Sequence, residues 1–142
     1  MHRDMTLELT TAFYGALAAL LYVFLTIRVI KSRVRNKVSL LDGGIDDVSR
    51  HIRTHANFAE YVPFIILLML LAELQGAHNA FLHIIGITTL IGRIAHYYSM
   101  TKIEPIAIAK GELNIKFRQI GMICTFIPLI GLAALLMWQY LV

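Results

Sequence analysis

Three polar residues, Arg53, Asn57 and Glu60, stand just before the apolar run 61–72. Their spacing places them on one face of an α-helix, which has 3.6 residues per turn. Guanidinium and amide groups bind carboxylates and peptide groups, and a carboxylate such as that of Glu60 binds an ammonium group. The spacing therefore predicts a site for a polar ligand. The alternative interpretation is a network that only fixes helix packing.

A second set of polar residues, Arg93, His96 and Tyr97, also falls on one helical face. If the two polar faces lie at the same membrane depth on neighbouring helices or subunits, they enclose a charged pocket. Such a pocket suits a small zwitterionic peptide better than a lipid tail or a metal ion.

His51 and His55 are candidate metal ligands. They lie on the helix that carries Arg53, Asn57 and Glu60, on its opposite face. Their spacing is one that metal ligands use on a helix, but no cysteine or second acidic residue joins them on that face. We therefore expect no metal site. We expect His55 to form a hydrogen bond to a neighbouring helix.

The elements that must position these residues are membrane helices. The chain has 142 residues, of which 58% are hydrophobic and 15% are charged, whereas soluble domains carry about a quarter charged residues. This composition predicts one integral membrane domain that covers residues 1–142. The first apolar run is too long for a cleavable signal peptide, so we expect it to remain as a membrane helix.

Four stretches are apolar enough to cross a bilayer, which takes about 20 residues. The run 61–72 is too short alone and must be extended backward through Arg53. Gly86 and Gly92 in the third stretch predict close helix packing. The predicted fold is an all-α bundle of four transmembrane helices, at about 6–34, 46–74, 79–101 and 112–141.

The basic residues indicate how the bundle is oriented. All lysines and arginines except Arg3 lie in or beside two connections, one between the first two helices and one at 101–112. The latter contains Pro105 and Gly111 and is predicted to be the longest polar connection. Because basic residues favour the cytoplasmic side, we expect both connections there and both termini on the other side. The net charge of +4 is then a topology signal, and we expect no nucleic-acid partner.

Two segments of these helices resemble known motifs. The run Arg53-Thr-His55-Ala-Asn57-Phe-Ala-Glu60-Tyr61-Val-Pro63 resembles the R-x-H-x-N-x-x-E-x-x-P signature of the MAPEG family, the membrane-associated proteins of eicosanoid and glutathione metabolism. The run Gly92-Arg93-Ile-Ala-His96 resembles a second family motif on the third helix. Residues 42–98 are similar to the small bacterial inner-membrane branch, and the resemblance covers nearly the whole chain.

The resemblance implies a homotrimer of four-helix subunits in the bacterial inner membrane. It also implies that glutathione, the co-substrate, binds at the cytoplasmic side between adjacent subunits. The implied glutathione contacts are Arg53, Asn57, Glu60 and Tyr61 of one subunit, Arg93 and His96 of the neighbouring subunit, and either Lys31 or Arg33 at the end of the first helix.

The resemblance also implies a catalytic residue, because the family uses an arginine near the start of the fourth helix. Arg118 is the matching candidate, with Lys116 as the second. A cation within hydrogen-bond reach lowers the pKa of the glutathione thiol, and the thiolate is the nucleophile. The family often has a tyrosine where this chain has Met100, which bears on catalysis more than on binding. Tyr97 is the candidate to replace that tyrosine, although it points in a different direction from the helix.

The resemblance implies a membrane-bound glutathione transferase that detoxifies hydrophobic electrophiles reaching it from the membrane lipid. Glutathione-dependent peroxidase activity toward lipid hydroperoxides is a related option. The main alternative is a non-catalytic member of the family that binds glutathione or a lipid and serves as a scaffold. A small transporter using Glu60 is less favoured, because a pocket on one side of the membrane provides no path across it.

Overall fold

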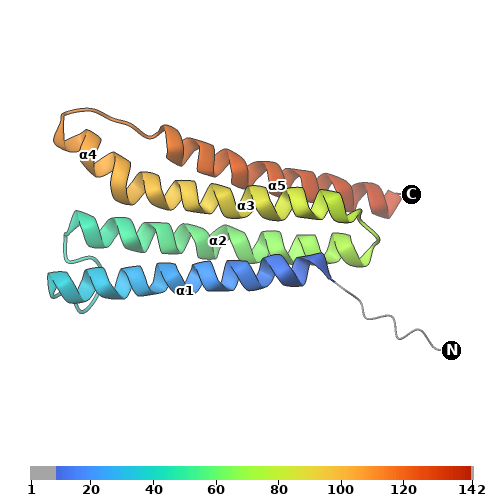
Figure 1. Cartoon of the computed structure of the whole chain (residues 1–142), viewed down its shortest axis with the longest axis horizontal. Coiled ribbons are helices and arrows are strands. Elements are labelled where there is room, and N and C mark those ends of the chain that lie inside the picture. Colours follow the sequence, from blue (N-terminus) through green and yellow to red (C-terminus); the bar gives the residue numbers. More distant parts are fainter. Residues whose placement is uncertain (1–8, 142) are drawn as a thin grey trace.

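The computed structural model describes residues 9–141, which form a bundle of long helices (Figure 1). The elements are α1 (Thr10–Asn36), α2 (Asp46–Leu74), α3 (Asn79–Tyr98), a π-helical turn (Ser99–Ile103), α4 (Glu104–Ala109) and α5 (Lys116–Leu141). Four helical segments are long and apolar enough to cross a membrane, and α3, the π-turn and α4 together form one of them. The predicted all-α fold with four membrane helices is confirmed. Residues 6–8, where the first helix is predicted to begin, lie outside the described residues.

The two basic connections lie at the same end of the bundle (Figure 1). One joins α1 to α2, and the other follows α4 and leads into α5. The short turn between α2 and α3 and the end of α5 lie at the opposite end. Within residues 9–141, the basic side chains are therefore gathered toward one end of the bundle, where the polar residues of α2 and α3 also lie.

The chain after α3 differs from the prediction. The expected polar connection at 101–112 is wrong in its first part, because the helix continues through the π-turn into α4 and ends at Ala109. Pro105 lies in the first turn of α4, where its missing N–H is not needed, and the π-turn before it shifts the hydrogen-bond register. Gly111, with φ at 74°, follows the end of α4. Helix α5 consequently begins at Lys116 and not at about 112.

Helices α3 and α5 approach each other closely because glycines face each other across their contact. A Cβ atom on Gly121 would lie 2.7 Å from the carbonyl oxygen of Gly92, and one on Gly92 would lie 2.6 Å from the Cβ of Cys124. Gly86 leaves room for the ring of Tyr14 from α1. The predicted role of Gly86 and Gly92 in close helix packing is thus confirmed.

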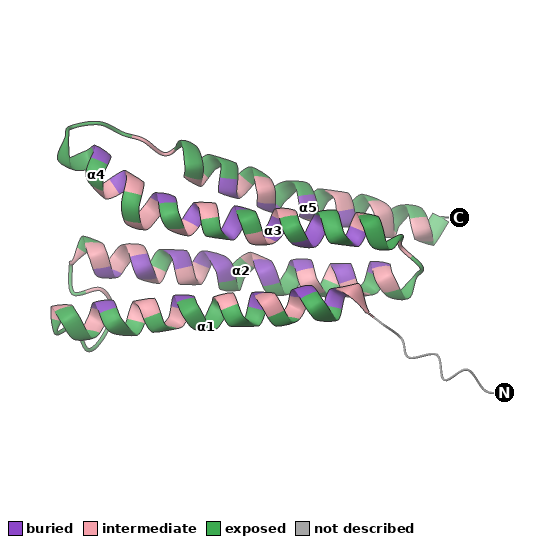
Figure 2. Cartoon of the chain, in the orientation of Figure 1, coloured by how far each residue is buried: buried purple, intermediate pink, exposed green. Residues whose placement is uncertain are grey.

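The outward faces of the helices are apolar. Figure 2 shows exposed residues along these faces and buried residues between the helices. Leu20, Ile130 and Trp138 are 69%, 68% and 64% exposed. Soluble monomers rarely expose apolar surface on this scale, whereas lipid tails cover it in a membrane. The exposed surface therefore agrees with the composition.

The first turn of α1 is held by a carboxylate from the far end of α2. Glu73 accepts hydrogen bonds from the backbone N–H groups of Thr10, at 2.6 Å, and Thr11, at 2.9 Å. The first N–H groups of a helix have no partner within the helix, and the helix dipole favours negative charge there. This contact fixes the register of α1 against α2.

Candidate functional site

Arg93 is the centre of a buried polar network between three helices. It lies on α3 and is only 3% exposed. Its guanidinium donates hydrogen bonds to the side-chain oxygen of Asn57 on α2, and to the hydroxyl of Thr125 and the carbonyl of Gly121 on α5. A buried charge is costly unless hydrogen bonds satisfy it. The network therefore fixes Asn57 and the middle of α2 against α5.

The polar residues predicted on one face of α2 are Arg53, Asn57 and Glu60, here called the α2 stripe. They divide into an exposed pair and one buried residue. Arg53 and Glu60 form an ion pair with 4.0 Å between Nη1 and Oε1, and their side chains are 60% and 52% exposed. Asn57 lies between them in sequence but is 9% exposed, because it faces Arg93. Arg53 and Glu60 are thus available to a ligand, whereas the oxygen of Asn57 is already engaged.

A groove of about 510 Å³ runs along α5 beside this stripe. Its lining residues are Ile115, Arg118, Gln119, Met122, Ile123 and Phe126. The Asn57 amide nitrogen is 3.8 Å from the Met122 sulfur, and the Tyr61 ring meets the Phe126 ring edge-on at a centroid distance of 6.0 Å. Two of the residues that line the groove with Arg118, Met122 and Phe126, therefore contact Asn57 and Tyr61 of α2.

Arg118 already has an anionic partner within the subunit. Its Nη1 is 3.1 Å from Oε2 of Glu104, the first residue of α4. Arg50 of α2 approaches the same oxygen at 3.6 Å. Glu104 is 3% exposed. Nothing in the sequence motifs pointed to this carboxylate, because it belongs to the segment predicted as a loop. Lys116, the other catalytic candidate, is exposed at the start of α5.

The remaining predicted residues lie elsewhere. His96 is 5% exposed and packs against Gly121 of α5. A Cβ atom added to Gly121 would lie 2.8 Å from the Cβ of His96. Tyr97 faces α1 and packs edge-on against Phe24, with 5.5 Å between ring centroids. Both side chains make packing contacts within this chain.

Lys31 and Arg33, the candidates on α1, are far from the groove. Lys31 is exposed, and Arg33 donates to the carbonyl oxygen of Ser39 at 3.2 Å. Helices α1 and α5 do not pack against each other. The fold of this chain therefore does not bring either residue to Arg118.

The histidine pair on α2 is used for packing. His55 Nε2 is 3.1 Å from the hydroxyl of Thr26, and its ring stacks on Tyr22 of α1. The predicted hydrogen bond of His55 to a neighbouring helix is confirmed. Within residues 9–141, no group of three or more His, Cys, Asp or Glu side chains gathers in a way that could hold a metal ion.

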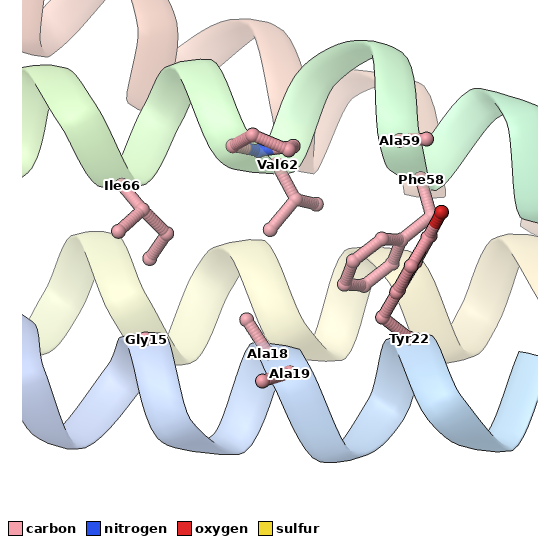
Figure 3. A pocket seen from close by; sticks show the side chains of 9 residues that line it. Gly15, Ala18, Ala19, Tyr22, Phe58, Ala59, Val62 and Ile66 are labelled. Atoms are coloured by element: carbon pink, nitrogen blue, oxygen red, sulfur yellow. The ribbon is translucent and has the colours of Figure 1, made fainter.

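An apolar pocket between α1 and α2 was not visible from the sequence motifs (Figure 3). It has a volume of about 570 Å³. Its lining residues are Gly15, Ala18, Ala19, Tyr22, Phe58, Ala59, Val62, Pro63 and Ile66. The small residues of α1 leave this space because they do not reach across to α2. The pocket and the groove on α5 share no lining residue.

Comparison with known proteins identifies the class. The profile of the MAPEG family matches residues 11–138, and the chain therefore belongs to the MAPEG family. It is 40% identical over 90 residues to the inner membrane protein YecN of Escherichia coli strain K12, which covers 63% of this chain and 69% of that protein. YecN of Escherichia coli O6:H1 strain CFT073 gives the same values. With its four apolar helices, the chain is an integral inner membrane protein.

Proposed function

We propose that this protein is a membrane-bound glutathione transferase, which joins the sulfur of glutathione to a hydrophobic electrophile. The observation that carries the proposal is the position of Arg118 on the groove of α5, beside the α2 stripe. A cation there can face a thiol, while the stripe holds the rest of the peptide. Membership of the MAPEG family, which includes glutathione transferases, supports the same activity.

Each exposed group has a defined task in this proposal. Arg53 binds a carboxylate of glutathione, and Glu60 binds its ammonium group; both side chains are more than half exposed. Arg118 stabilises the thiolate after the thiol proton has passed to solvent. The thiolate then forms a carbon–sulfur bond with the electrophile, and the leaving group departs with its electron pair. In the peroxidase variant of this reaction, the thiolate attacks an oxygen of a lipid hydroperoxide, the O–O bond breaks and the lipid leaves as an alcohol. A second glutathione then condenses with the resulting sulfenic acid to give glutathione disulfide and water.

The same distribution of residues supports a proposed assembly. Lys31 and Arg33 on α1 cannot reach Arg118 within one subunit, because α1 and α5 do not pack against each other. A homotrimer in which α1 of one subunit lies beside α5 of the next would complete the site. Arg93 would act from within its own subunit, through Asn57. We place the basic end of the bundle, and with it the glutathione site, on the cytoplasmic side.

The proposal is tested by the ultraviolet absorbance of the thiolate on rapid mixing of the purified protein with glutathione. We expect a thiolate signal in the wild type and in Lys116→Ala, and its loss in Arg118→Ala, with turnover reduced by about 10²-fold or more. Lys116 is a matched control because it is a cation two residues away that does not line the groove. Binding of glutathione without any thiolate signal would contradict the mechanism.

A non-catalytic role as a glutathione- or lipid-binding scaffold is the second candidate. The observation that favours it is the pairing of Arg118 with buried Glu104, which offsets the positive charge that a thiolate would use. Calorimetric binding of glutathione without turnover across a panel of electrophiles would favour this role. Turnover with any of these electrophiles would exclude it.

A further inference from the structure

Glu104 joins the segment after α3 to both α2 and α5 through its side chain. Its Oε1 accepts a hydrogen bond from the Ser99 hydroxyl at 3.1 Å. Its Oε2 lies 3.1 Å from Arg118 and 3.6 Å from Arg50. The carboxylate is therefore held by hydrogen-bond donors from the π-turn and from α5, and by an ion pair with Arg50 of α2.

The π-turn explains how this carboxylate comes to face inward. It occupies Ser99–Ile103 and ends directly before Glu104. A π-turn inserts an extra residue into the helical register, and such turns recur at functional sites. The shift directs Glu104 between α2 and α5, while its neighbour Ile106 is 60% exposed. Without the shift, a continuous α-helix would turn this side chain to another face.

The charges around Glu104 do not cancel. Arg50 and Arg118 share one carboxylate, so a positive charge remains after the pairing. The side chain of Arg118 is 37% exposed, whereas that of Arg50 is 19% exposed. A further anion can therefore reach Arg118 without breaking its bond to Glu104.

We propose that Glu104 is a positioning residue that holds the Arg118 guanidinium at the groove, so that a bound thiolate meets a fixed cation. This inference rests on the proposed transferase function. It assigns to the π-turn and α4 the task of fixing a side chain of α5. The competing view is that Glu104 is only a counter-charge that weakens Arg118.

The two views predict opposite signs for one measurement, the pH midpoint at which bound glutathione ionises. Loss of a nearby negative charge favours a thiolate and lowers the midpoint. Loss of the group that positions Arg118 removes the cation from the thiolate and raises the midpoint. We expect Glu104→Gln to raise it by about one pH unit, with kcat reduced by about tenfold and little change in the KM for glutathione.

Matched variants separate positioning from general effects. Glu112→Gln makes the same change of charge at an exposed residue of the adjacent loop and should leave the midpoint unchanged. Glu104→Asp keeps the charge and should fall between the wild type and Glu104→Gln. In an Arg118→Ala background, Glu104→Gln should cause no further loss of kcat, because the two residues act through one contact. A lowered or unchanged midpoint in Glu104→Gln would overturn the proposal.

A second readout requires no glutathione. Modification of Arg118 by a dicarbonyl reagent, followed by peptide mass spectrometry, reports how firmly its guanidinium is held. We expect several-fold faster modification in Glu104→Gln and no change in Glu112→Gln, in preparations with wild-type helical content. If the wild type forms no thiolate, the transferase proposal fails and this experiment alone decides on Glu104. An unchanged rate there would overturn the positioning role, and Glu104→Asp supplies the same test if Glu104→Gln does not fold.

Discussion

Arg93 shows what a single residue contributes to this site. Its guanidinium is buried in the protein interior and donates hydrogen bonds to acceptors on two other helices. The spacing in the sequence identified the polar face of α3 but not the partner, because periodicity gives a direction and no distance. The structure places the partner, Asn57, in the same chain. Asn57 therefore joins the polar face of α2 to the interior of the bundle.

We predict that Asn57→Leu destabilises the protein by about 1–3 kcal/mol, since it leaves a buried guanidinium N–H without its acceptor. Thermal unfolding in detergent micelles measures the effect. Glu60→Gln, on an exposed residue of the same helix, is the control and should change the stability by less than about 0.5 kcal/mol. Equal losses in both variants would contradict the buried role of Asn57.

At the scale of elements, the sequence predicts what hydrophobic length and periodicity encode. Helix α2 spans Asp46–Leu74, the predicted range, because its polar first half and apolar second half share one helical register. The extension of α3 was not predictable in this way. Pro105 suggests a break, and only the π-turn lets the helix pass it. As a result, Glu104 was missed while Arg118, at the start of an evident apolar helix, was found.

The contact between α3 and α5 gives a prediction for the glycines. We expect Gly92→Ala to destabilise the protein, because a Cβ there would lie 2.6 Å from the Cβ of Cys124 and 3.1 Å from the carbonyl oxygen of Gly121. Overpacking of this kind costs about 1–3 kcal/mol, more than the gain in helix propensity of about 1 kcal/mol. Gly131→Ala is the control, since its nearest neighbours would be 4.0 Å away, and it should be neutral or stabilising. Thermal unfolding of both variants in the same detergent distinguishes them.

For the molecule as a whole, the predicted basic residues of α1 and the predicted catalytic residue of α5 lie on helices that are separated from each other. Lys31 and Arg33 belong to α1, and Arg118 belongs to α5, and these helices do not pack against each other. The sequence could indicate each set by its motif but could not show this separation, which depends on how the helices are arranged in space. The proposed trimer brings the two sets together at each subunit contact.

Subunit mixing tests this arrangement. We predict that an Arg118→Ala subunit and a Lys31→Ala, Arg33→Ala subunit are each inactive alone but regain turnover when expressed together. In a random mixture, about a quarter of the contacts between subunits would carry both intact helices. Turnover is measured on copurified mixed assemblies, each subunit carrying a different tag. Mixed assemblies that stay inactive would contradict a site shared between subunits.

The carboxylate of Glu73 at the start of α1 has a consequence for biosynthesis. The N–H groups of Thr10 and Thr11 meet their acceptor only after the ribosome has made more than 60 further residues. Until then, the first turn of α1 has no such partner, and lipid offers none for backbone groups. The first turn of α1 is therefore completed only within the α1–α2 hairpin, after the end of α2 has been translated.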